Sequence, residues 1–237
     1  QNIIIDVVKA GVPVISSASL TVDSTPVVSG TAEVGSTITA VIAGATYTTT
    51  AADGTWSVDT GSATPASGSL LVNANGTNSV SVTATDAAGN VSAAGTQTLT
   101  VDTTVPTVSI TDDTGGTSAV NGDITFTFTF SDAISDFLAE DITVANGTKG
   151  AFSQTSSTVY TLIVTPAANS TAAVTVDVAK DKATDAAGNN NTAGTATQAV
   201  DTLAPTAPTI AAITTPDNDS TPTITVTAEA GSTVKVY

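Results

Sequence analysis

The sequence predicts an all-β fold in which β-sandwich modules follow one another in tandem. The hydrophobic share of 41% consists mainly of Val, Ala and Ile, and aromatic residues make up only 4%. β-Branched side chains are stiff at χ1 and pack well on pleated surfaces, so this composition favours strands. Two further observations support this fold class. Apolar and polar residues alternate in several segments, and short motifs recur at nearly constant spacing.

Two short motifs carry the repeat. An apolar residue followed by Asp, ahead of a proline, occurs at Asp6, Asp102 and Asp201, and the pentapeptide DAAGN occurs at 86–90 and again at 185–189. Both motifs return after roughly 100 residues, which is the size of one immunoglobulin-type sandwich. We therefore expect immunoglobulin-like Greek-key sandwiches in an extended array.

The module limits follow from these motifs. A third pattern, STP…TAE…GST, occurs within 24–37 and returns within 220–233, so the chain runs into a third repeat. Gln1 is not a start residue, and we expect the chain to be a piece of a longer one. The predicted organisation is the last strand of a preceding module at 1–6, module one at 7–102, module two at 103–201, and the start of module three at 202–237.

Apolar and polar residues alternate within the modules. This period of two is typical of strands with one buried side, and it predicts strands at 79–86, 124–130, 159–165 and 173–179. The phenylalanines of 124–130 share one face and are expected in the core. One short helical stretch is expected at 134–141. Turns that favour positive φ are predicted at Asp53-Gly54, Asn75-Gly76, Asn121-Gly122 and Asn146-Gly147.

The charge and the missing residue types exclude several functions. The chain has 21 acidic residues against 5 Lys and Arg, a formal charge of −16. Such a field repels phosphate backbones and anionic membranes, and no run of about 18 apolar residues exists, so we expect neither a nucleic-acid partner nor membrane insertion. Cys, Met and His are absent, which excludes thiolate and imidazole metal ligands and Cys or His catalysis. Hard cations bound through oxygen remain compatible with this composition.

The order of the motifs resembles a known family. STP…TAE.GST, ADGTW, SVTATDAAGNVS and LTVDTT.P in module one, with PTVSIT, ITFTFTFSD and a second TDAAGN in module two, are similar to the bacterial Ig-like repeats of giant adhesins. These are the type I-secreted, RTX-class and biofilm-associated surface proteins, and the two modules look like sister subtypes. The resemblance implies a stalk segment at the bacterial cell surface, often calcium-bound at its junctions, that holds a terminal binding domain away from the cell.

Acidic residues fall at one end of each predicted module. In an up-and-down arrangement of strands, the loops that bear Glu33, Asp53 and Asp86 return to the end nearest the linker residue Asp6. Neighbouring carboxylates repel each other by on the order of 1 kcal/mol in water, and Ca²⁺, which takes about 6–8 oxygens, relieves this. We therefore expect Ca²⁺ at the junctions, bound through Asp6, Glu33, Asp86, Asp102, Asp132, Asp141, Asp185, Asp201 and Glu229. A second set of candidate ligands is Asp53, Asn90, Asp136, Glu140, Asp181 and Asn189.

A loop aspartate also has a simpler explanation. Its carboxylate usually caps the backbone of its own turn, and we favour this interpretation for Asp53. Asp112, Asp113 and Asp123 form a further candidate group at the opposite end of module two. No EF-hand loop and no glycine-aspartate nonapeptide is present. A junction calcium would turn a flexible string of modules into a rod, with adjacent modules of the same chain as partners.

Three other functions compete with the stalk. A carbohydrate- or ice-binding sandwich would require exposed aromatic rings or a flat, regular threonine array; 46–51 is rich in Thr, but we expect Trp56 in the core. A fibre assembled from like chains by strand donation is also possible, given the orphan strand at 1–6. An enzyme is not expected, because the paired acids lie at module ends, where no concave pocket is implied.

Overall fold

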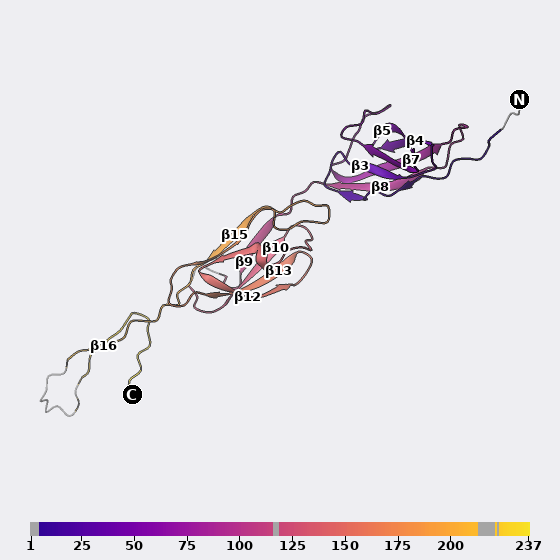
Figure 1. Cartoon of the computed structure of the whole chain (residues 1–237). Helices are drawn as coiled ribbons and strands as arrows, with labels where there is room; N and C mark the ends of the chain where they lie inside the picture. Colours follow the sequence, from indigo (N-terminus) through magenta and orange to yellow (C-terminus); the bar gives the residue numbers. More distant parts are fainter. Residues whose placement is uncertain (1–4, 116–118, 213–220, 222) are drawn as a thin grey trace.

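The computed structural model describes residues 5–115, 119–212, 221 and 223–237. Within these residues the regular elements are β-strands and one 3₁₀ turn at Ala139–Asp141. The predicted all-β fold is therefore confirmed. Two sandwiches follow one another along the chain, and a smaller two-stranded segment follows the second (Figure 1). No helix of the described residues is long and apolar enough to cross a membrane.

Module one is a sandwich of two sheets. The smaller sheet has the strand order β1–β3–β6, and the larger has the order β2–β8–β7–β4–β5. β2 pairs with β8 in parallel, whereas the other neighbours are antiparallel. The strands are β1 (Val14–Ile15), β2 (Leu20–Thr21), β3 (Val27–Thr31), β4 (Thr37–Ile42), β5 (Ala45–Thr50), β6 (Thr55–Asp59), β7 (Asn75–Thr85) and β8 (Gly95–Asp102).

The core of module one lies between these sheets and is mainly aliphatic. The alternation in β4 buries Ile38, Ala40 and Ile42 completely, because every second side chain of a strand points to the same face. Trp56 is 3% exposed, and its indole Nε1 donates a hydrogen bond to the carbonyl of Thr31 at 3.3 Å. The prediction that Trp56 belongs to the core is confirmed.

Module two divides its strands differently between its two sheets. One sheet has the order β12–β13–β10–β9 and the other has the order β11–β14–β15. This division into four and three strands is that of a constant-type immunoglobulin sandwich. The strands are β9 (Val108–Asp112), β10 (Ile124–Phe130), β11 (Ile142–Ala145), β12 (Gly147–Gln154), β13 (Val159–Pro166), β14 (Val174–Val178) and β15 (Gly194–Gln198).

The core of module two is built around aromatic rings. Phe126, Phe128 and Phe130 are buried on one face of β10, as predicted. Phe137, from the loop before β11, is 2% exposed, and its ring centroid lies 5.0 Å from that of Phe130 and 5.2 Å from that of Tyr160. Tilted and edge-to-face pairs of this kind add to the gain from burial.

One short turn explains why the two modules differ. β4 and β5 are joined by Ala43 and Gly44, with φ values of 45° and 89°. Two successive positive φ values are those of a type I′ hairpin turn, which keeps both strands in one sheet. In module two a single such residue, Asn146 at φ 58°, separates β11 from β12, and the chain crosses to the opposite sheet.

Most local predictions agree with the structure. β10 has the predicted bounds and β13 covers 159–165, whereas β7 covers all but the last residue of 79–86 and β14 lies within 173–179. Positive φ occurs at Gly54 and Asn146, as expected for those turns.

Two turn predictions were wrong. Asn75-Gly76 begins β7 because both residues pair with β8. Asn121 and Gly122 follow the bridge between Val120 and Val200, and neither has a positive φ. The expected helical stretch at 134–141 is reduced to its last three residues, Ala139–Asp141.

The described residues near the two chain ends contain few strands. β16 (Thr209–Ile210) pairs with β17 (Val226–Thr227) in the segment predicted to begin module three. Residues 1–4 of the strand expected at 1–6 lie outside the described residues, and Ile5 and Asp6 belong to no strand. The two hydrophobic cores fall within 7–102 and 103–201.

Candidate functional site: the joint between modules

The DAAGN loop of each module is organised by its own aspartate. Asp185 Oδ1 accepts hydrogen bonds from the backbone N–H groups of Ala187, Gly188 and Asn189 at 2.8–2.9 Å, and Asp185 Oδ2 accepts one from the Asn189 side chain at 2.9 Å. Gly188 has a φ of 98°, which a residue with a Cβ rarely adopts. The motif therefore encodes one rigid turn that presents Asn189.

The asparagine of the loop reaches the preceding linker. Asn189 Nδ2 donates to the carbonyl oxygen of Asp102 at 2.8 Å, across 87 residues of sequence. Asn90 makes the same contact in module one, with the carbonyl oxygen of Asp6 at 3.2 Å. Asn189 is buried, so losing either partner would leave a desolvated polar group unpaired.

Each linker aspartate forms the same local turn. The Oδ1 atoms of Asp6, Asp102 and Asp201 accept the backbone N–H of the residue two positions later, at 3.0, 2.9 and 3.1 Å. This is the capping role that loop aspartates usually play. The turn fixes the direction in which the chain leaves one module and enters the next.

Module one holds the linker from the other side. Asn75 Oδ1 accepts hydrogen bonds from the N–H and the hydroxyl of Thr103 at 2.8 and 3.0 Å, and from the hydroxyl of Thr104 at 3.3 Å. Asp102 is bound by Asn189 of module two, so the segment 102–104 is held by both modules at once. A linker anchored on both sides loses the freedom that linked domains otherwise have.

The modules also touch directly. The backbone N–H of Val22, just after β2, donates to the carbonyl oxygen of Ala187 at 3.1 Å. A Cβ built on Gly188 would lie 4.0 Å from Cγ1 of Val22. Ala187 is half-buried, whereas Ala88, its counterpart in module one, is exposed.

Hydrogen bonding lowers the pKa of both loop aspartates. For Asp86 the largest cause is the donation from the Asn90 side chain, followed by the Asn90 backbone. For Asp185 partial burial acts to raise the pKa, but hydrogen bonds from the Asn189 side chain and from backbone N–H groups of the loop outweigh it, and the pKa is lowered. Both loops are therefore built for the ionised carboxylate.

Glu33 and Glu229 have matching roles at the starts of their repeats. Glu33 Oε2 accepts the N–H of Gly11 at 3.3 Å, and Glu229 Oε2 accepts the N–H of Thr206 at 3.0 Å. Each glutamate thus ties its loop to the first residues of its own module. The second occurrence of the TAE…GST pattern keeps this contact, although β16 and β17 are the only strands in the described residues of that segment.

The remaining predicted ligands of module two have separate partners. Asp132 accepts from the hydroxyl of Ser131, Asp136 from the N–H and hydroxyl of Thr184, and Asp141 from the N–H of Leu138 in the 3₁₀ turn. Asp181 has a φ of 61° and lies 3.4 Å from the amine of Lys180. Glu140 lies in the 3₁₀ turn with its side chain exposed.

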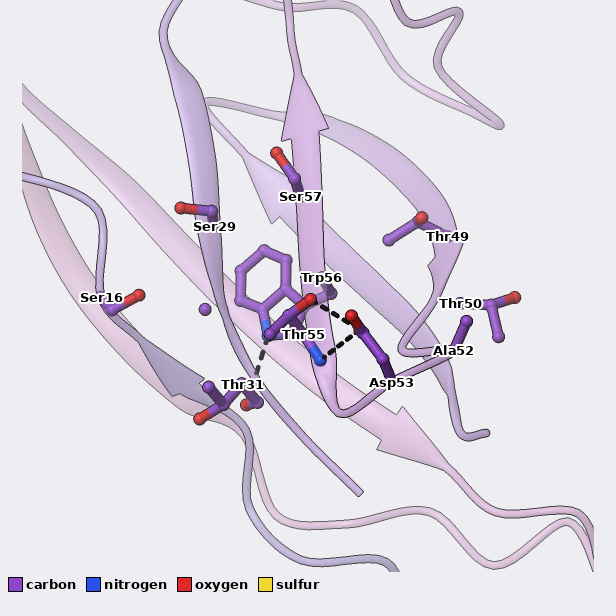
Figure 2. A pocket seen from close by; sticks show the side chains of 11 residues that line it. Ser16, Ser29, Thr31, Thr49, Thr50, Ala52, Asp53, Thr55, Trp56 and Ser57 are labelled. Carbon is purple, nitrogen blue, oxygen red and sulfur yellow. Dashed lines mark hydrogen bonds between the residues drawn. The ribbon is translucent and has the colours of Figure 1, made fainter. Parts of the chain in front are cut away.

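Asp53 has the role that we favoured from the sequence. Its Oδ1 accepts the N–H and the hydroxyl of Thr55 at 3.1 and 2.7 Å, as Figure 2 shows. The Thr55 side chain is the largest cause of the lowered pKa of Asp53. Its carboxylate therefore closes the turn before β6.

The fit of these residues to Ca²⁺ is incomplete. Among the residues that the structure describes, no three acidic side chains come together closely enough to hold a metal ion. At each joint the amide of Asn90 or Asn189 bridges one carboxylate oxygen and one linker carbonyl. Two oxygens are fewer than the about 6–8 that Ca²⁺ takes, so an ion here would draw on further backbone carbonyls and water.

A hollow beside β6 bears on the ligand-binding alternative. It is lined mainly by Ser and Thr, among them Ser29, Thr31, Thr50 and Ser57, and the Trp56 ring lies at its base between β3 and β6 (Figure 2). All nine aromatic residues of the chain are at described positions, and among the Trp and Tyr rings only Tyr237 is exposed. The hollow therefore offers hydroxyl groups but no aromatic face for a sugar to stack on.

Sequence reasoning missed two parts of the joint. Asn75 was interpreted as a turn residue. Val22 could not be identified from its side chain, because it contacts module two through its backbone N–H. The recurrence of Asn one residue before Gly was the available signal for Asn75, and it pointed to a turn instead. Nothing in the sequence around Val22 distinguishes it from other strand-end valines.

Comparison with protein families agrees with the fold of module two. Residues 102–203 match the family model described as a bacterial Ig-like domain, so this segment is similar to the family that the sequence motifs resemble. Among solved structures, the chain is similar to a tetra-tandem repeat in the extending region of a large adhesion protein, with 22% identity and a TM-score of 0.28. The alignment covers 81% of this chain and 49% of that chain, so this chain spans about half its length. No curated protein matches the chain.

Proposed function

We propose that the chain is a spacer segment of a bacterial cell-surface adhesin or extracellular filament, in which Ig-like modules stand in series on fixed joints. The observation that carries the proposal is the double anchoring of the linker 102–104, by Asn75 of module one and Asn189 of module two. A spacer needs this property, because linked domains otherwise move relative to each other.

The strength of the joint comes from several modest contacts. Each hydrogen bond contributes about 1 kcal/mol to the stability of the joint. Removing a bond to a buried group costs more free energy, because it leaves that group without a partner. Asn75, Asn189 and the Val22 N–H contribute separate bonds, so together they hold one orientation of the modules over others. Backbone and side-chain amides carry these bonds, so the joint does not require a large apolar interface.

We propose further that Ca²⁺ binds at these joints as an additional cross-link. Support comes from the formal charge of −16 and from the asparagine bridge between a linker aspartate and a loop aspartate, Asp6 with Asp86 and Asp102 with Asp185. The coordination would be completed by backbone carbonyls and water, as is common for Ca²⁺. Binding to the folded state alone would raise the melting temperature, and the rise would grow with the logarithm of the Ca²⁺ concentration once this exceeds the Kd.

Small-angle scattering on the full chain tests the joint. Asn75→Ala combined with Asn189→Ala is expected to broaden the distribution of module orientations and shorten the mean end-to-end length, while circular dichroism shows both modules folded. Asn90→Ala is the matched control, because it removes the equivalent bond from a loop that does not face module two. Unchanged scattering in the double variant would overturn the spacer proposal.

The calcium proposal has its own readout. Thermal melting and scattering are recorded with Ca²⁺, with Mg²⁺ and with a chelator, on the unaltered chain and on Asp102→Asn. A melting temperature that rises with Ca²⁺ and responds less in Asp102→Asn supports binding at this joint. Equal curves with Ca²⁺ and chelator would remove calcium from the proposal and leave the hydrogen-bonded joint intact.

One observation favours the ice-binding alternative. On the larger sheet of module one, β5, β4 and β7 align Thr50, Thr37 and Thr85 in one row, and Thr48, Thr39 and Thr83 in the next. Sheets twist by roughly 20–25° per strand, so such rows depart from a flat lattice within a few strands. Thermal hysteresis measured on the full chain decides this alternative, and we expect none.

A further inference from the structure

The contacts that module one offers to the DAAGN loop of the next module are backbone contacts. Val22 provides its N–H to Ala187, and Asp102 provides its carbonyl oxygen to Asn189. Every residue has these groups, with proline as the exception for the N–H. All the residue-specific chemistry of this part of the joint lies in the incoming loop.

Module two carries the same two groups at its own far end. Thr21 pairs with Val101 in parallel, one residue before Asp102, and Val120 pairs in parallel with Val200, one residue before Asp201. This register places Asn121 where module one has Val22, and Asp201 where it has Asp102. The exposed Asn121 and Asp201 line one hollow, together with Gly122 and Asp123.

The two DAAGN loops show what docking changes. Their internal hydrogen bonds are the same in kind, with Asp86 holding Asn90 as Asp185 holds Asn189. Asn189 is buried where its loop meets module one, whereas Asn90 is only half-buried. The loop is therefore formed before docking, and docking covers its asparagine.

We propose that the N–H of Asn121 and the carbonyl oxygen of Asp201 form a docking surface for the Asp-x-x-Gly-Asn loop of a further Ig-like module. The residue type at the receiving position is immaterial, since Val22 and Asn121 differ in every side-chain property and share the required backbone geometry. Modules of either subtype can therefore follow either subtype. This inference rests on the proposed spacer function and names the partner of its joint.

Amide hydrogen exchange measured by NMR on two full-length chains tests the proposal. The first is the chain itself, and the second carries an additional copy of 103–201 inserted after Asp201. In the first chain we expect the Val22 N–H to exchange slowly. In the second we expect the Asn121 N–H to slow by at least about tenfold relative to the first, because it becomes bonded to the inserted loop.

Two matched variants complete the test. Asn189→Ala placed only in the inserted copy is expected to restore fast exchange at Asn121 in a chain of the same length. In Val22→Asn of the first chain, the N–H at position 22 is expected to exchange as slowly as in the parent. Fast exchange there would contradict the claim that docking does not depend on the residue type at the receiving position.

The outcomes separate the two proposals. A Val22 N–H that exchanges rapidly in the first chain would contradict the joint and with it the spacer function. A protected Val22 together with an Asn121 N–H that exchanges equally fast in both chains would overturn the docking surface alone.

Discussion

Module one and module two build the same joint on different sandwiches. Module one pairs β5 with β4 in its five-stranded sheet and fills its core mainly with aliphatic side chains. Module two places β12 in the opposite sheet and packs a cluster of aromatic rings. The DAAGN loops nevertheless coincide in their hydrogen bonds. The joint is therefore encoded in a loop and a linker, independently of how the core behind them is assembled.

The comparison separates two kinds of constraint. The core has to fill a space, which different sets of side chains can do. The joint has to place an amide opposite a carbonyl, and Asn189 does so because Asp185 and Gly188 fix the loop around it. Core composition can therefore vary between modules while the loop sequence repeats.

The largest effect is expected from the aromatic core of module two. Phe137→Ala removes a ring packed against Phe128, Phe130, Phe152 and Tyr160, and is expected to cost about 3–5 kcal/mol of unfolding free energy. Calorimetry should show one of two transitions shifted to lower temperature while the transition of module one stays in place. If both transitions shifted together, the two modules would unfold as one unit.

The next largest effect is expected from a buried asparagine, Asn191, whose counterpart one repeat earlier is Ser92. Asn191 is 1% exposed, accepts the N–H groups of Lys182 and Ala183, and donates to the carbonyls of Ala179 and Thr192. Asn191→Ala leaves several buried groups unpaired and is expected to cost about 2–4 kcal/mol in chemical denaturation of module two.

The control for this prediction lies one repeat earlier. Ser92 holds only the N–H of Ala84 and the carbonyl of Ala93, so Ser92→Ala is expected to cost module one less, about 1–2 kcal/mol. If the two variants lost the same unfolding free energy, the number of hydrogen bonds made by the buried group would not determine the loss of stability.

A smaller effect is expected from the turn that sets the strand allocation of module one. Gly44→Val places a β-branched residue at a φ of 89° and is expected to destabilise module one by about 1–3 kcal/mol in urea unfolding. Ala43→Gly is the control, because it relieves a positive φ and is expected to be neutral or slightly stabilising. A Gly44→Val chain as stable as the parent would remove this turn as the cause.

The smallest effect is expected on acidification. The pKa of Asp185 is lowered in the folded state, so its stabilisation is complete above the ordinary carboxylate pKa of about 4 and is lost as pH falls through the lowered value. The melting temperature of module two should therefore fall as the pH drops below about 4, and less steeply in Asp185→Asn. Equal pH dependence in both chains would contradict this role.

Local sequence accounts for much of this molecule. Strict alternation predicted 124–130 as a strand with its phenylalanines buried, because side chains of a strand alternate between core and solvent. The repeated DAAGN identified the loops that form the joint. It did not identify their partners. Asp6, Asp102 and Asp201 cap turns of their own, whereas Glu33 and Asp136 bind segments far away in the sequence.

The sequence by itself determined the all-β class, the repeat and the turn-forming role of residues such as Asp53, because these depend on neighbours within a few positions. Tertiary structure alone decided that Asn75 and Asn189 meet one linker and that Val22 meets Ala187. Those contacts join residues far apart in the chain. Backbone atoms make up at least one side of each of these contacts, and every residue type carries the same backbone groups, so the sequence does not reveal them.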